Sequence, residues 1–102
     1  MVLPWLRVAV TGPSMLPTLA PGEWVLVRRN VTPRVGAVVL VRRPERLVLK
    51  RVVRATEGGW WVEGDNAGAS DDSRVFGAVR TEDVIGEVRW RYYPLRSFGR
   101  IR

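Results

Sequence analysis

Short runs of apolar residues alternate with turn-forming residues along most of this chain. Runs rich in β-branched and aromatic residues, bounded by Gly, Pro and Asp, are typical of β-strands. On this pattern we predict strands at 8–10, 23–29, 37–42, 47–53, 60–63 and 87–93. The run at 37–42 shows no alternation, which indicates a strand covered on both faces.

The last predicted strand has a different pattern. In residues 87–93, Val88, Trp90 and Tyr92 alternate with Glu87, Arg89 and Arg91 before Pro94. This period of two predicts a half-buried strand whose charged residues face outward.

Polar segments separate these runs. Residues 64–77 are rich in Gly, Asp and Ser and are predicted to form a long functional loop. Residues 81–83 are predicted to cap one short helical turn, and the basic tail is expected to fray. The fold class is therefore a small, mostly antiparallel β fold, barrel-like, in one domain over 1–102, with its motif-bearing core at about 8–93 and its tail at 94–102.

The composition, 46% hydrophobic and 26% charged over 102 residues, is that of one soluble globular domain. No apolar run approaches the ~18 residues of a membrane span, and no signal-peptide pattern is visible. We therefore expect no transmembrane helix and a cytoplasmic location. The absence of Cys and His excludes disulfides, thiolate metal sites and a Ser-His-Asp triad, so no metal and no cofactor are expected.

The net charge is +7, and arginines are scattered along the whole chain. This spacing is typical of exposed strand faces. Of the 17 basic residues 16 are Arg, so that Lys50 is the single lysine. Unlike arginine, a lysine amine can lose its proton at accessible pH.

Ser14 is the candidate nucleophile. It follows Gly12 at the end of an apolar run and lies between Pro13 and Pro17, which stiffen the turn. Without His or Cys, the candidate base is Lys50, whose neighbours at 47–49 and 52–53 are aliphatic. Burial disfavours the charged amine and lowers its pKa, so the lysine can accept a proton.

The loop at 64–74 supplies the third group of candidate residues. An ion pair between Asp72 and Arg74 is expected to pin this loop. Ser70 is then expected to exchange a hydrogen bond with the Lys50 amine.

Three segments resemble the conserved boxes of the signal peptidase I family. They are Ser14-Met-Leu-Pro-Thr-Leu19, Lys50-Arg-Val-Val53, and Gly64-Asp-Asn66 with Ser70-Asp-Asp-Ser-Arg74, in the order of the family and over about 8–88. The resemblance implies a serine endopeptidase in which Ser14 is the nucleophile, Lys50 the general base and Ser70 the residue that orients the lysine. It implies an oxyanion hole made by the Ser14 and Gly12 N–H groups. The structural residues of the third box would be Asp65, Asn66, Asp72, Ser73 and Arg74.

The family's membrane anchor and large extra β domain are not found in this sequence. An Arg-rich core of this length resembles the soluble branch of nickel-type superoxide dismutase maturation proteases. The implied fold is of the signal peptidase or LexA-like type. The implied partner is a protein substrate, bound extended, with small residues before the cut, from which an N-terminal leader is removed. Peripheral membrane contact is left open, and no nucleic acid is expected.

Three alternatives remain. The chain is a signal peptidase I core separated from its anchor, or a LexA-like self-cleaving domain. From a different class, it is a basic β-barrel that binds nucleic acid, with stacking surfaces at Trp60, Trp61, Tyr92 and Tyr93.

Overall fold

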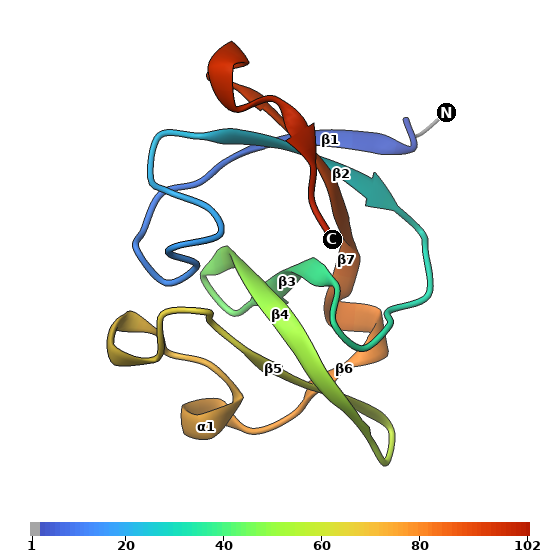
Figure 1. Ribbon diagram of the computed structural model, residues 1–102. Coiled ribbons are helices and arrows are strands. Elements are labelled where there is room, and N and C mark those ends of the chain that lie inside the picture. Colours follow the sequence, from blue (N-terminus) through green and yellow to red (C-terminus); the bar gives the residue numbers. More distant parts are fainter. Residues whose placement is uncertain (1–2) are drawn as a thin grey trace.

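The computed structural model describes residues 3–102 and contains one antiparallel sheet (Figure 1). The sheet order is β1-β2-β7-β3-β4-β5-β6, and β8 pairs with β7. The strands are β1 (Trp5–Ala9), β2 (Trp24–Arg29), β3 (Val38–Arg43), β4 (Arg46–Thr56), β5 (Gly59–Glu63), β6 (Val79–Arg80), β7 (Val84–Tyr93) and β8 (Gly99–Arg100). This confirms the predicted small antiparallel β fold.

The helical elements are short. They are the 3₁₀ helices η1 (Ala67–Ala69), η2 (Thr81–Asp83) and η3 (Leu95–Ser97) and the single-turn helix α1 (Ser73–Phe76). The turn at 81–83 was expected from the sequence. Within residues 3–102, no helix has the length and apolar character needed to span a bilayer.

The strands β1 and β4 each have an unpaired edge, and these two edges lie on the two sides of one pocket. From 46 to 50, β4 pairs with β3 on one side, whereas its pairing with β5 begins only at Arg51. Among residues 3–102, β1 pairs with β2 alone. The pocket described below is lined by consecutive residues of both segments, 8–15 and 46–50. Unpaired backbone groups at such edges are available to another extended chain.

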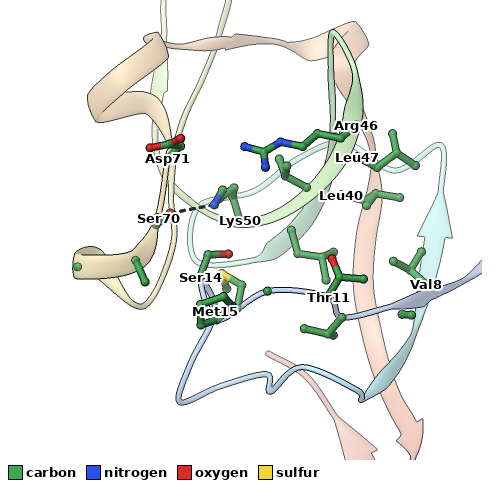
Figure 2. Close-up of a pocket in the computed structure, with 18 residues that line it drawn as sticks. Val8, Thr11, Ser14, Met15, Leu40, Arg46, Leu47, Lys50, Ser70 and Asp71 are labelled. Atoms are coloured by element: carbon green, nitrogen blue, oxygen red, sulfur yellow. Dashed lines mark hydrogen bonds between the residues drawn. The ribbon is translucent and has the colours of Figure 1, made fainter.

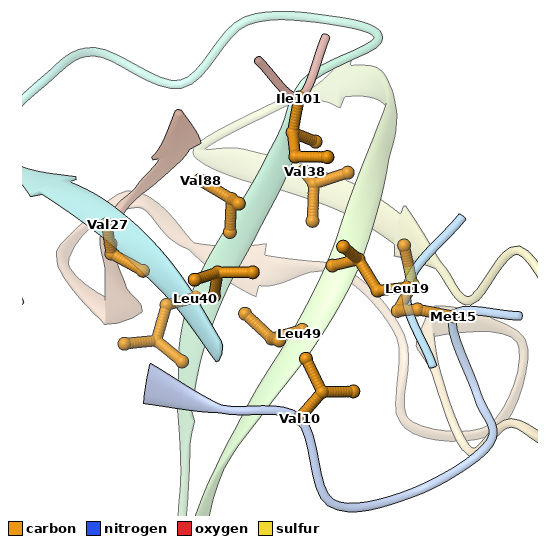
Figure 3. Packing of buried hydrophobic residues seen from close by; sticks show 10 residues of the cluster. Val10, Met15, Leu19, Val27, Val38, Leu40, Leu49, Val88 and Ile101 are labelled. Carbon is orange, nitrogen blue, oxygen red and sulfur yellow. The ribbon is translucent and has the colours of Figure 1, made fainter. Parts of the chain in front are cut away.

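The strand β3 divides the core into two clusters. Val38 and Leu40 pack into the first cluster, and Val39 and Val41 pack into the second. All four are at most 1% exposed, which confirms the prediction that this strand is covered on both faces. The first cluster contains Met15 and Leu19, which follow Ser14 in the chain (Figure 3). Its buried members are Val10, Met15, Leu19, Val25, Val27, Val38, Leu40, Leu49, Val88 and Ile101.

The prediction of a frayed C-terminal tail was wrong. η3 is followed by β8, which pairs with β7 through Trp90↔Arg100 and Arg91↔Gly99. The rings of Trp90 and Phe98 lie 5.7 Å apart, and Ile101 is only 7% exposed within the first cluster. Burial of this aliphatic side chain and the added strand pairing hold the tail against the sheet.

The prediction that Glu87 faces outward was also wrong. Glu87 is 3% exposed, because Arg34 and Arg89 both donate hydrogen bonds to its carboxylate. A charged residue can occupy a buried sheet position when its charge is paired in this way.

Candidate active site

The turn that carries Ser14 is anchored by its apolar residues. Met15 is 1% exposed and Leu19 is fully buried, and the Leu19 N–H donates to the Met15 carbonyl oxygen at 3.0 Å. Both side chains pack under the turn in the first core cluster. The buried side chains of Met15 and Leu19 fix this turn on the core, and Ser14, just before Met15, is thereby held at the wall of a pocket.

Asp65 and Asn66 tie the Ser14 turn to the rest of the fold. The Asn66 N–H donates to the Ser14 carbonyl oxygen at 2.9 Å, and its side-chain amide donates to the Pro13 carbonyl oxygen at 3.1 Å. Asp65 accepts hydrogen bonds from the hydroxyl of Thr18 and from Arg51 on β4, with Arg51 Nε at 2.9 Å and Nη2 at 2.8 Å. The Arg51 hydrogen bonds lower the pKa of Asp65, so this carboxylate stays charged and keeps the turn clamped.

Lys50 enters the pocket from β4. Its side chain is almost completely buried, and Nζ donates a hydrogen bond to Ser70 Oγ at 2.8 Å (Figure 2). Burial lowers the pKa of the Lys50 amine below its ordinary value, although the nearby carboxylate of Asp72 acts in the opposite direction. A neutral amine can accept a proton, which arginine at this position could not do.

Asp72 lies behind Ser70 and is fully buried. Its carboxylate accepts hydrogen bonds from the Gly64 N–H at 2.9 Å, from Ser70 Oγ at 3.0 Å, and from Arg74, whose Nε lies at 2.9 Å. Burial acts to raise the pKa of Asp72, but these donors outweigh it and hold the pKa well below the usual range. Since the Ser70 hydroxyl donates to Asp72, its lone pairs face the Lys50 amine, and the amine is held in one direction.

The same loop is closed by Ser73. Its hydroxyl accepts a hydrogen bond from the buried Val62 N–H of β5 at 2.8 Å. Asp72 also accepts from the Arg74 N–H at 3.1 Å and so caps the first turn of α1. These contacts fix the loop that carries Ser70 against β5.

Gly64 is a site residue that the sequence reasoning passed over. A Cβ atom there would overlap Ser70 Oγ and would lie 2.6 Å from the Ser14 carbonyl oxygen. The signal was present, since a glycine opens the Gly64-Asp-Asn segment. Its lack of a side chain lets the Ser14 turn and Ser70 approach each other closely.

The pocket formed by these elements has a volume of about 500 Å³. Ser14, Lys50 and Ser70 line it (Figure 2), and so does Gly12. Ser14 Oγ and Lys50 Nζ are not joined by a hydrogen bond. Within residues 3–102, the Gly12 and Ser14 N–H groups donate no hydrogen bond, so both are free to bind an oxygen atom. No cluster of three or more Asp and Glu side chains suited to a metal ion occurs in that same range.

Comparison with known proteins identifies the family. Residues 5–88 match the Peptidase S24-like family. The chain is 34% identical to the mitochondrial ATP-independent inner membrane protease subunit 1a of Arabidopsis thaliana, over 91% of this chain and 73% of that protein. It is 27% identical to the mitochondrial inner membrane protease subunit 1 of Xenopus tropicalis, over 93% and 73% of the two chains. It is also 30% identical to a probable signal peptidase I-1 of Synechocystis sp., over 79% of this chain and 42% of that protein. The chain therefore belongs to the Peptidase S24-like family of proteases, together with the signal peptidase I group that its three sequence boxes resemble.

Proposed function

We propose that this protease is a serine endopeptidase in which Ser14 is the nucleophile and Lys50 the general base. The observation that carries the proposal is the buried single amine of Lys50, which lines the same pocket as Ser14 and is directed by Ser70. Catalytic hydrogen bonds are often long before substrate binds, so the unbonded Ser14 and Lys50 are compatible with this role.

The substrate enters as an extended segment between the open edges of β1 and β4. Each edge offers unpaired backbone groups along one side of the pocket. A chain that pairs with either edge gains main-chain hydrogen bonds, which fix it regardless of its side chains. Small residues before the cut allow its carbonyl carbon to approach Ser14.

The reaction then follows from the groups around the pocket. Neutral Lys50 takes the hydroxyl proton of Ser14 as the serine oxygen attacks the substrate carbonyl carbon. The Gly12 and Ser14 N–H groups stabilise the oxyanion of the tetrahedral intermediate. The lysine gives its proton to the leaving amine, and a water molecule hydrolyses the acyl-enzyme and regenerates Ser14.

Ser70 is a positioning residue in this scheme, since it acts through Lys50. Asp65, Asn66, Asp72, Ser73 and Arg74 hold the Ser14 turn and the Ser70 loop in place. The prediction of one domain over 1–102, made from the sequence, is kept as part of this proposal.

The proposed substrate is a precursor protein with an N-terminal leader, and nickel superoxide dismutase is the specific candidate. The proposal of this substrate rests on the resemblance of the sequence to that branch of proteases. A cytoplasmic location is proposed on the same basis, while two of the relatives are named as inner membrane proteases.

The test is incubation of the purified protein with a leader-bearing precursor, followed by mass spectrometry of the products. The wild type is expected to cleave, and Ser14→Ala and Lys50→Ala are each expected to lose at least about 10⁴-fold in rate. Ser97→Ala, in η3 and away from the pocket, is the matched control and should cleave normally.

Activity that survives Lys50→Ala would reject Lys50 as the base. Cleavage of other leaders but not of the superoxide dismutase precursor would keep the peptidase and reject that substrate.

A further inference from the structure

Arg46 occupies an unusual place among the arginines of this protein. It begins β4, four residues before Lys50, and it lines the wall of the pocket. Its side chain is exposed, and Figure 2 shows its guanidinium group directed into the opening, with Asp71 on the facing wall. Both residues act electrostatically on the Lys50 amine, Arg46 lowering and Asp71 raising its pKa.

Neither charge is bound to a protein partner. Within residues 3–102, Arg46 and Asp71 take part in no ion pair and in no side-chain hydrogen bond. Other arginines near the pocket are committed to acids: Arg51 binds Asp65, and Arg74 binds Asp72. The five N–H donors of Arg46 are therefore available to whatever enters the pocket.

A guanidinium group in this position matches one class of ligand group. Its planar fork binds a carboxylate through two parallel hydrogen bonds, which a neutral amide or an aliphatic side chain cannot reproduce. The net charge of +7 also attracts acidic chain segments toward the protein over longer distances.

We propose that Arg46 is a specificity-determining residue that selects polypeptide substrates with an acidic side chain close to the scissile bond. This inference rests on the proposed peptidase function and names the substrate class of the same pocket. Asp71 on the facing wall repels a carboxylate and thereby confines the acidic side chain to the Arg46 side.

The strand geometry limits where the acidic residue lies in the substrate. Arg46 and Lys50 are four residues apart on one strand, so they share a face and lie ~13 Å apart along it. An extended substrate beside β4 has a similar rise per residue. The acidic side chain is therefore expected within about four residues of the cut.

The experiment uses one parent peptide that the wild type cleaves and Ser14→Ala does not. A single Glu, or Gln as its neutral match, is placed in turn at each of four positions before and after the cut. We expect the wild type to prefer Glu about three- to tenfold in kcat/KM at one position. Arg46→Glu should reverse this preference, so that a Lys peptide is cleaved faster than the Glu peptide.

Arg96→Glu is the matched control, because it makes the same change of net charge on η3, outside the pocket. It should keep the preference of the wild type. The ratio of two peptides within one variant cancels any change that Arg46→Glu causes in the basicity of Lys50. Since Arg46 is exposed, its variant should melt within a few degrees of the wild type, at about the same temperature as Arg96→Glu.

Equal cleavage of Glu and Gln peptides at every position would overturn the inference and leave the peptidase function intact. An equal loss of preference in Arg96→Glu would also overturn it, since net charge alone would then explain the selection. If no peptide is cleaved in a Ser14-dependent manner, the proposed function itself fails and this inference with it.

Discussion

Asp72 and Glu87 are both hidden carboxylates, but their surroundings differ. Asp72 is 0% exposed and Glu87 is 3% exposed. Asp72 accepts from two backbone N–H groups, from the Ser70 hydroxyl and from Arg74. Glu87 accepts from arginine side chains alone among residues 3–102, with Arg34 Nη2 at 3.0 Å and Arg89 Nε at 3.3 Å.

The two networks also end in different places. The network of Asp72 continues through Ser70 to the amine of Lys50, which lines the pocket. The network of Glu87 ends at two arginines that lie outside the pocket lining. Burial of an acid is thus a poor guide to function by itself, whereas its connection to a group that can exchange a proton is informative.

Among the variants that test the contrast between Asp72 and Glu87, Asp72→Asn is expected to have the largest effect on stability and on rate. The new amide places its N–H groups against the donors Gly64 N–H, Ser70 or Arg74, and Arg74 keeps only the more distant carboxylate of Glu63, at 3.9 Å. We expect the free energy of unfolding to fall by ~3 kcal/mol and the proteolytic rate by about 100-fold.

Urea unfolding and peptide hydrolysis measure the two effects of Asp72→Asn. The neighbouring Asp71→Asn is the control for stability, since Asp71 is exposed and unpaired in the described chain, and should change it by less than ~0.5 kcal/mol. Equal stability of the two variants would contradict the importance given to the buried network.

Ser70→Ala removes the hydrogen-bonded link between Asp72 and Lys50 but keeps the charge of the Asp72 carboxylate. Asp72 keeps Arg74 and its backbone donors, so the loss of stability should stay near ~1 kcal/mol. The Lys50 amine loses its acceptor and its fixed direction, and kcat should fall about 10- to 100-fold with KM nearly unchanged. Ser70→Thr, which retains the hydroxyl, should recover part of the rate, and a purely structural role would instead change stability and KM together.

Glu87→Gln should affect stability without affecting activity. Arg34 is more than half exposed and can be solvated when the charge of Glu87 is removed, so we expect a loss of only ~1–2 kcal/mol. Proteolysis per folded molecule should remain within about twofold of the wild type. A large loss of activity at unchanged fold would show that the Glu87 network reaches the pocket and would remove the contrast with Asp72.

The smallest effect is a change in the titration of Lys50. The Asp72 carboxylate favours the charged amine, so its removal in Asp72→Asn should move the Lys50 pKa further down, whereas Glu87→Gln should leave it unchanged. Because Lys50 is the single lysine, NMR of lysine-labelled protein observes this side chain alone. A wild-type midpoint near the free-amine value of ~10.4 would contradict the effect of burial.

Local sequence patterns predicted the strands better than they predicted which charges are buried. The continuous apolar run at 38–41 correctly predicted a strand covered on both faces. Successive side chains of a β-strand point to opposite faces, so an unbroken apolar run places apolar side chains on both. The alternation at 87–93 failed at Glu87, because its main partner Arg34 lies 53 positions away in the sequence. No local pattern contains such a pairing.

The candidate site was predictable to a similar extent. Sequence motifs predicted Ser14, Lys50 and Ser70 as site residues, and the structure brings all three to one pocket. Their catalytic roles remain predictions. Gly64 and Arg46 were not singled out, since their importance depends on what lies opposite them. The tail was misjudged in part for the same reason, because the cluster that buries Ile101 contains residues from distant parts of the chain such as Val10 and Val38.

If substrates bind as proposed, the open edges of β1 and β4 impose a condition on any polypeptide that is to be cut. A segment already folded into a helix or a sheet has its peptide groups occupied and cannot offer them to a new neighbour. It must first unravel over several residues, and fixing each of these free residues beside a strand then costs roughly 1–2 kcal/mol of conformational entropy. Under the proposed binding mode, the protein would therefore distinguish unfolded from folded chain, and a precursor would expose its cleavage site only while that segment stays unstructured.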